Sequence, residues 1–258
     1  MPMVNLCLIL VISLLPFSLV HASEEDSDGI VLAGTRLIYP SAQKEVTFGL
    51  QNESKKPFLI QAWISEDESE ATPADAKVPF VIVPPLFRIE EGQRSTLRIL
   101  QIPNDLPGEQ ESLFWLSVLA IPGQAAGSIP SPGMMELAIE TRIKLIYRPV
   151  TLKGNVASAV ASLEFSLDKA GRSLTVTNPS PYFVNLVSGT LTQGASRRGL
   201  VAVEAIGPGH VLSFGVDGVM DADVGIQGNV EMNYLDDGGL LRTVRLPLLA
   251  QRNIHEME

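Results

Sequence analysis

The stretch MELAIETRIKLIYRP, at Met135–Pro149, indicates the fold most clearly. In its first half, the apolar residues Met135, Leu137 and Ile139 alternate with acidic residues or alanine. Successive side chains of a β-strand point to opposite faces, so this alternation predicts one long strand with an apolar face, over Met135–Tyr147. Because proline cannot donate to a strand ladder, we expect the strand to end before Pro149.

Similar short apolar runs recur on both sides of this stretch, and sustained helical periodicity is scarce. Many short strands separated by polar turns and turns rich in Gly and Pro are typical of β-sandwiches. We predict the other strands over Gly29–Leu32, Glu45–Gln51, Phe58–Ser65, Phe80–Val83, Ser95–Gln101, Ser112–Ala120, Leu163–Leu167, Ser173–Thr177, Phe183–Thr192, Asn229–Tyr234 and Leu241–Leu246.

A domain boundary is predicted at Arg148-Pro149-Val150, where the long strand ends and a new series of strands begins. The two parts, 23–149 and 150–258, are each of the size of an immunoglobulin-like domain. The sequence therefore predicts an all-β chain with two domains.

The first 22 residues are interpreted as a secretion signal and are set aside from the fold. An apolar run over Leu6–Val20 leads to small residues at the two positions that a signal peptidase reads, Val20 and Ala22, and then to acidic residues. We expect cleavage after Ala22 and export of the mature chain. The alternative is an uncleaved anchoring helix, against which Pro16 and the shortness of the run argue.

Charge and composition argue against several classes of function. The formal net charge of −10 belongs wholly to the mature chain, and an acidic surface is a poor binder of nucleic acid. Cys7 is the only cysteine and leaves with the leader, so the mature chain has neither a thiol nor a disulfide. The acidic tract Glu66–Glu70 is interpreted as a solvated loop and not as a metal site.

Motifs of enzymes are also missing from the sequence. After cleavage only His210 and His255 remain, and we find no zinc-binding spacing, no phosphate-binding loop and no nucleophile elbow. We therefore expect no enzymatic activity, no cofactor or metal, and no small-molecule substrate.

Three motifs, in order along the chain, carry a resemblance to a known family. They are GTRLIYP at Gly34–Pro40, LPGEQESLFWL at Leu106–Leu116 and RIKLIYRP at Arg142–Pro149. This ordered set resembles the periplasmic pilus (fimbrial) assembly chaperones, the PapD-like family. Because the mature chain has no disulfide, it resembles the short-loop subclass of that family. The second motif, which continues to Ile121-Pro122, departs from the family signature at Glu109, where Asp, Asn or Ser is usual, and at Ser117, where Asn is usual.

The resemblance implies a fold, a location and partners. The fold would be two immunoglobulin-like β-sandwich domains arranged as an L, or boomerang, in the periplasm. The partners would be pilus subunits (pilins) and an outer-membrane usher. The implied mechanism is donor-strand complementation, in which the chaperone lends its G strand to a subunit that lacks its own last strand.

Particular residues follow from the resemblance. Met135, Leu137 and Ile139 would enter the apolar groove of the subunit, whereas their pattern alone favours the alternative that they face the core of the chain itself. Arg36 and Lys144 match the family positions that grip the C-terminal carboxylate of the subunit through charge-assisted hydrogen bonds. Strict alternation places the even-numbered Lys144 on the face opposite the odd-numbered donor residues.

A third set of charged residues is implied to hold the two domains at their angle. Glu111, Arg148 and Asp236 match the interdomain acid–base–acid cluster of the family. The local sequence Leu235-Asp236-Asp237-Gly238 departs from the usual Asn-Asp-Tyr-Gly. The alternative is that the three are ordinary surface charges.

Two other functions stay open on the sequence alone. A secreted immunoglobulin-like adhesion or structural module would explain the strands, but not the motifs around Arg36 and Lys144. A relative of the chaperones that no longer serves a pilus would keep both. Genes for an usher and for pilins beside this gene would separate these alternatives from a pilus chaperone.

Overall fold

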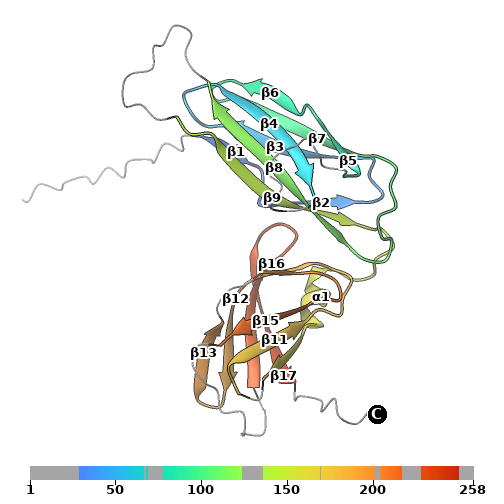
Figure 1. Ribbon diagram of the computed structural model, residues 1–258, viewed down its shortest axis with the longest axis vertical. Helices are drawn as coiled ribbons and strands as arrows, with labels where there is room; N and C mark the ends of the chain where they lie inside the picture. Colours follow the sequence, from blue (N-terminus) through green and yellow to red (C-terminus); the bar gives the residue numbers. More distant parts are fainter. Residues whose placement is uncertain are drawn as a thin grey trace, which may run out of the picture.

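The structure is a computed structural model that describes residues 29–66, 68, 78–123, 136–168, 170–200, 204–216 and 228–249. The predicted leader at 1–22, with its cleavage site, lies outside these residues, and so do Met135 and His255. Two lobes built from strands stand at an angle to each other and are joined by the connection that follows β9 (Figure 1). Within the described part of the chain, no helix is both long and apolar enough to span a membrane.

The first lobe is a sandwich of two sheets, with the strand orders β1-β3-β7-β5 and β2-β9-β8-β4-β6. The chain passes from the first sheet to the second between β1 and β2, so β1 pairs with β3 whereas β2 pairs in parallel with β9. The strands are β1 (Ile30–Leu32), β2 (Arg36–Pro40), β3 (Glu45–Asn52), β4 (Phe58–Ser65), β5 (Phe80–Val83), β6 (Leu86–Ile89), β7 (Arg94–Gln101), β8 (Ser112–Pro122) and β9 (Ile139–Arg148).

The core of the first lobe lies between its two sheets. On β9, the odd-numbered Ile143 and Leu145 are buried in this core beside Phe114 and Leu116 of β8. Each such side chain contributes roughly 1.5–3 kcal/mol when it is fully buried. Because side chains alternate along a strand, the even-numbered residues of β9, Lys144 among them, project from the outer face of the sheet.

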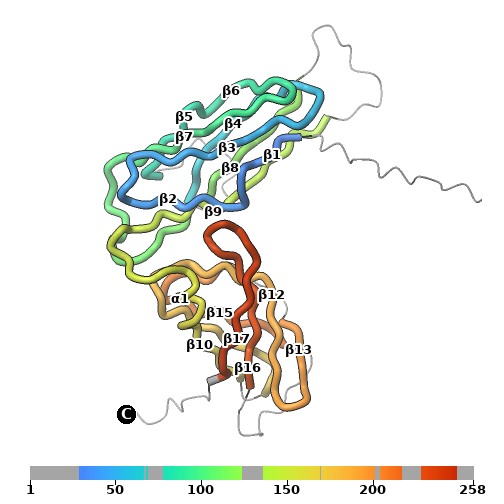
Figure 2. Tube along the Cα trace, turned by 180° about the vertical axis from the view of Figure 1, so that it is seen from behind, coloured from blue at the N-terminus to red at the C-terminus, as the bar shows by residue number. Residues whose placement is uncertain are grey.

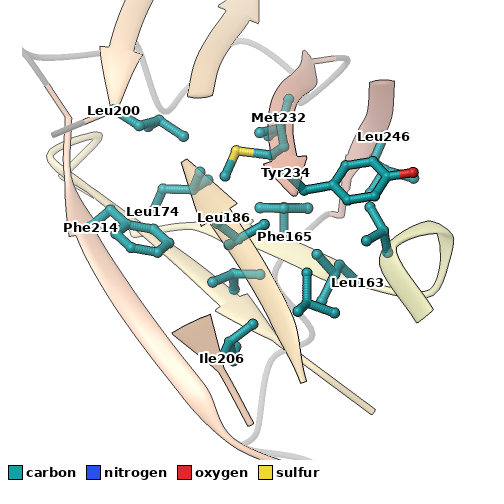
Figure 3. Close-up of a cluster of buried hydrophobic side chains, with 14 of the residues drawn as sticks. Leu163, Phe165, Leu174, Leu186, Leu200, Ile206, Phe214, Met232, Tyr234 and Leu246 are labelled. Carbon is teal, nitrogen blue, oxygen red and sulfur yellow. The ribbon is translucent and has the colours of Figure 1, made fainter. Parts of the chain in front are cut away.

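The second lobe is also a sandwich, in which the parallel pair β10–β17 joins the two faces into the order β13-β12-β16-β17-β10-β11-β15. Leucine, phenylalanine and other apolar side chains from both faces meet in its core (Figure 3). Its elements are α1 (Val156–Ala161), β10 (Glu164–Leu167), β11 (Ser173–Thr177), β12 (Val184–Gln193), β13 (Ser196–Leu200), β14 (Ala205–Ile206), β15 (Val211–Gly215), β16 (Gly228–Leu235) and β17 (Leu241–Leu249).

The prediction of an all-β chain with two immunoglobulin-like sandwiches is confirmed. The predicted strand Met135–Tyr147 is wrong at its start, because the ladder with β8 ends at the pair Ala120–Ile139 and β9 begins there. The predicted domain boundary stays a prediction; in the structure, β9 ends at Arg148 and α1 begins at Val156.

One turn is built in the same way in both lobes. Asn52 in the first lobe and Asn178 in the second are buried, and each side-chain amide lies within hydrogen-bonding distance of three carbonyl oxygens. Two residues later, Ser54 and Ser180 each donate to the Asn side-chain oxygen. In the second lobe this turn fixes the segment up to Phe183, which contacts the first lobe.

The β16–β17 hairpin of the second lobe reaches β2 and β9 of the first lobe (Figure 2). At its tip, Gly239 has a φ of +79°. A Cβ atom added there would lie 2.9 Å from Thr35 Oγ1 of the first lobe. The turn geometry and the close approach of the two lobes therefore both favour glycine at this position.

Candidate functional site

Arg36 and Lys144 lie side by side at the junction of the two lobes. They are register partners in the parallel pair of β2 and β9, so the ladder itself holds the two cations on neighbouring strands. Arg36 is also in contact with the second lobe, because its Nη1 donates to the carbonyl oxygen of Leu235 at 3.4 Å. The structure thus brings together two residues that are far apart in the sequence.

Neither cation forms an ion pair with any residue that the structure describes. The Nε atom of Arg36 is buried and has no hydrogen-bond partner. Burial lowers the pKa of Lys144 and the neighbouring charge of Arg36 lowers it further, against the opposing effect of the Glu68 charge. Burial also lowers the pKa of Arg36, against the opposing effect of Asp237 and Asp236. Two half-buried cations with an unused donor form a site suited to an anion.

β9 presents an open backbone edge next to this pair. β2 pairs with β9 only from Lys144 to Arg148, and no described strand pairs with that side of β9 at 139–143. An exposed edge of this kind can accept a further strand.

Ile139 begins this open edge and Leu137 lies two residues before it; they are 59% and 65% exposed. They are odd-numbered, like the core residues Ile143 and Leu145, but they extend past the core of the lobe. Both line a cavity of about 240 Å³ whose other walls include Ile30 and further apolar residues of β4 and β8. Met135, the third predicted donor residue, lies outside the described residues.

Glu111 and Arg148 are in contact, as the predicted interdomain cluster requires. The third member of the cluster is Asp237 and not the predicted Asp236. Arg148 Nε donates to Glu111 Oε1 at 2.5 Å, and its two Nη atoms donate to the Asp237 carboxylate at 2.7 and 2.8 Å. Asp236 was predicted in that place. Instead, the Asp236 carboxylate accepts hydrogen bonds from Arg242 and from two backbone N–H groups of its own hairpin. Its side chain therefore points into that hairpin and not toward Arg148.

The Glu111–Arg148–Asp237 cluster crosses between the lobes. Glu111 is 1% exposed, and its Oε2 accepts the backbone N–H of Phe183 in the second lobe at 2.6 Å. The guanidinium of Arg148 also lies over the ring of Tyr182, 5.2 Å from the centroid. These contacts tie the ends of β8 and β9 to two separate segments of the second lobe.

Burial and charge oppose each other in this cluster. Burial raises the pKa of Glu111, and the charge of Arg148 and the Phe183 N–H offset this only in part. Burial acts against the charge of Arg148, but hydrogen bonds and charges from Asp237 and Glu111 outweigh it and raise the pKa of Arg148. Removal of either carboxylate would therefore leave the remaining charges poorly compensated.

Two residues of the site were missed from the sequence. Asp237 is the carboxylate that Arg148 binds, although the sequence predicted Asp236. An aspartate that begins an Asp-Asp-Gly-Gly turn tends to accept hydrogen bonds from its own backbone, which leaves the second aspartate to pair with Arg148. Trp115 was quoted within a motif but given no role. In the structure its ring lies beneath Lys144, with Nζ 5.1 Å from the centroid. Cross-strand pairing of aromatic and basic residues is too common to single out such a contact in advance.

Comparison with known proteins shows the family of the chain. Residues 29–153 match the family model for the pili and flagellar-assembly chaperone PapD N-terminal domain. Residues 158–245 match the model for the pili assembly chaperone PapD C-terminal domain. The chain belongs to the PapD family of pilus assembly chaperones.

Particular relatives are similar over most of the chain. The probable fimbrial chaperone YadV of Escherichia coli K12 is 38% identical over 183 residues, which cover 69% of this chain and 74% of YadV. The crystal structure of YadV superposes with a TM-score of 0.70 and 33% identity, over 85% of this chain and 99% of that one.

Two further solved structures are of similar chaperones. The periplasmic chaperone SfaE has 30% identity and a TM-score of 0.64, over 86% of this chain and 100% of its own. The Salmonella enterica chaperone SafB, solved in complex with the SafA pilin, has 28% identity and a TM-score of 0.68. That match covers 85% of this chain and 96% of the SafB chain.

Proposed function

We propose that this chaperone works in the periplasm, where it captures pilin subunits by lending them the open edge of β9. The observation that carries the proposal is the adjacency of an unpaired cation pair, Arg36 and Lys144, to an unpaired strand edge with exposed apolar side chains. The complex of SafB with a pilin supports a pilin as the partner.

The cation pair and the strand edge would act on one subunit at the same time. The C-terminal carboxylate of the subunit would accept hydrogen bonds from Arg36 and Lys144, neither of which forms an ion pair with a described residue. Since Lys144 lies five residues beyond Ile139 on the same strand, this anchor would fix the register of the subunit strand on β9.

The apolar side chains would supply the second contribution. Leu137 and Ile139, and Met135 before them, would fill the groove of the subunit, at roughly 1.5–3 kcal/mol for each fully buried side chain before ordering costs. The main-chain hydrogen bonds of the added strand come in addition.

Location and further partners follow from the same proposal. The leader over 1–22 would direct the chain to the periplasm, where the similar chaperone SfaE resides, and Ser23 would be the mature N-terminus. An outer-membrane usher would receive the loaded subunit. The chaperone would hold its subunit without catalysing a reaction and without a cofactor.

Co-expression in the periplasm with a pilin encoded beside this gene tests the proposal. We expect a 1:1 complex that is recovered by affinity purification and size-exclusion chromatography. Arg36→Ala or Lys144→Ala should abolish it, whereas Arg88→Ala, which removes an exposed cation on β6 of the same lobe, should leave it intact. Equal recovery of the complex with all three variants would contradict the assignment of the site.

A further inference from the structure

Trp115 lies directly across the ladder from Lys144. The two are register partners in the antiparallel pair of β8 and β9, and both project from the outer face of the sheet. Lys144 Nζ lies 5.1 Å from the centroid of the Trp115 ring, within the range of a cation–π contact. On its other side, Lys144 has Arg36 as its register partner. The ammonium is therefore flanked by an aromatic face and by a like charge.

The ring supplies the direct favourable contact of Lys144, because Glu68, the described carboxylate whose charge attracts this ammonium, forms no ion pair with it. An ammonium that is half-buried beside a guanidinium is repelled by it, and a flexible lysine stem would carry the charge outward into water. The negative face of an indole attracts a cation without neutralising it. A carboxylate partner, in contrast, would compete with the incoming carboxylate of a subunit.

We propose that Trp115 is a positioning residue that holds the Lys144 ammonium beside Arg36, ready for the terminal carboxylate of a subunit. This inference rests on the proposed function, because it concerns the same anchor. Because the ring already holds the Lys144 side chain in place, less conformational entropy is lost when a carboxylate binds. Such pre-organisation raises the affinity for the carboxylate. Trp115 would act through Lys144 and would not touch the subunit carboxylate itself.

The first experiment measures the pKa of the Lys144 ammonium in the free protein by NMR of labelled lysine side chains, with Lys144→Met to assign the signal. Loss of the ring in Trp115→Leu removes the stabilisation of the charged form, so we expect the pKa of Lys144 to fall. Trp115→Phe keeps an aromatic face and should lower it less. Leu119→Ala, on the same face of β8 but opposite Glu140, should leave it unchanged.

The second experiment measures the affinity of a synthetic peptide that carries the C-terminal strand of a neighbouring pilin, as the free acid and as the amide. We expect Trp115→Leu to reduce the preference for the free acid by about five- to thirtyfold, the range of a partly desolvated cation–π contact. Combined with Lys144→Met, it should cause almost no further loss, because the ring acts only through that ammonium.

A fluorinated-tryptophan series separates the electrostatic role of the ring from its packing. In a Trp63→Phe background Trp115 is the only tryptophan, so fluorinated analogues change that ring alone. Because fluorination draws charge from the ring face at nearly constant shape, we expect the pKa of Lys144 and the acid preference to fall stepwise. A ring that only packs would leave both unchanged along the series.

The outcomes distinguish the two proposals. If the protein with Trp115 intact binds acid and amide equally, the carboxylate anchor is wrong, and the pKa of Lys144 still decides whether the ring holds the ammonium. If the acid is preferred but neither Trp115→Leu nor the fluorinated series changes that preference or the pKa of Lys144, the anchor stands and the role of Trp115 is overturned.

Discussion

At the scale of single residues, the site combines features that would be unfavourable in a purely structural position. Arg36 and Lys144 are like charges on adjacent strands, both are half-buried, and neither has an ion-pair partner among the described residues. Such an arrangement opposes folding and persists where an incoming anion makes use of it.

The charge of Lys144 leads to a prediction about pH. Its pKa is lower in the folded protein than in the unfolded chain, so between the two values the unfolded state binds more protons and stability rises with pH. We expect Lys144→Met to be at least as stable as the parent protein at neutral pH. The parent should then gain relative to the variant as the pH rises toward 10.

Denaturant unfolding of the two proteins at a series of pH values checks this prediction. The difference between their free energies of unfolding cancels the titration of the other lysines and tyrosines. A difference that does not depend on pH would show that folding leaves the pKa of Lys144 unchanged, and one that moves in favour of the variant as the pH rises would show that the ammonium is stabilised in the fold. Either result would contradict the prediction.

At the scale of the element, β9 has two roles along its length. From Ile143 onward its odd-numbered side chains belong to the core of the first lobe, whereas Ile139 at its start and Leu137, two residues before it, extend past that core and are exposed. The same alternation thus serves stability in one half of the strand and is available for binding in the other half.

This division predicts opposite outcomes for the same substitution along β9. Leu137→Glu or Ile139→Glu should leave the free protein folded and abolish capture of a pilin, because a carboxylate cannot enter an apolar groove without a large penalty. Ile143→Glu, on the same side of the strand but buried, should unfold the first lobe. Circular dichroism together with the co-expression assay distinguishes the cases. Unfolding by Ile139→Glu would mean that this side chain belongs to the core.

Elements with clear alternation could be predicted from the sequence, and short or weakly patterned ones could not. β4, β5 and β11 have the predicted bounds, because apolar alternation and flanking turns delimit them. The strand β14 has two residues, and β13 contains two arginines and a glycine, so neither has an apolar pattern. The helix α1 was also missed, although Asn155 and Ser158 form a capping box at its start.

The candidate site was predictable to the extent that its members lie on patterned strands. Arg36 and Lys144 are register partners, as an anchor of both residues requires, and the even position of Lys144 gave its face on β9; the anchor itself stays a prediction. The choice between Asp236 and Asp237 depended on how a hairpin turn uses its first carboxylate, which strand periodicity does not report.

At the scale of the whole molecule, one hairpin connects the anchor with the contact between the lobes. The β16–β17 hairpin contributes the Leu235 carbonyl to Arg36 and the Asp237 carboxylate to Arg148 (Figure 2). The position of the second lobe and the surroundings of the cation pair are therefore set by the same contacts.

The interdomain cluster predicts a graded loss of stability. Arg148→Ala leaves Glu111 buried without its counter-charge and should destabilise the free protein by up to about 3–5 kcal/mol, the range for breaking a buried pair. Asp237→Asn should have a smaller effect in the same direction, because Asp237 is partly exposed. Melting temperatures of the free variants measure both effects.

A second substitution provides the control for this cluster. Glu111→Gln in the Arg148→Ala background removes the uncompensated carboxylate and should restore part of the lost stability. Asp236→Asn should not affect Arg148, because Asp236 pairs with Arg242 in its own hairpin. Melting of Arg148→Ala at the temperature of the parent protein would remove the structural role of the cluster.

The central claim is that Arg36 and Lys144 together bind the terminal carboxylate of a pilin, and titration calorimetry tests it most directly. The titrant is a pilin C-terminal peptide, as the free acid and as the amide, and the proteins are the parent, Arg36→Ala, Lys144→Ala and the double variant. We predict that the parent prefers the acid and that each single variant loses about 2–5 kcal/mol of its binding. The two losses should be non-additive, because both residues address one carboxylate, and the double variant should bind acid and amide alike. Equal affinity of the parent protein for the two peptides would contradict the account.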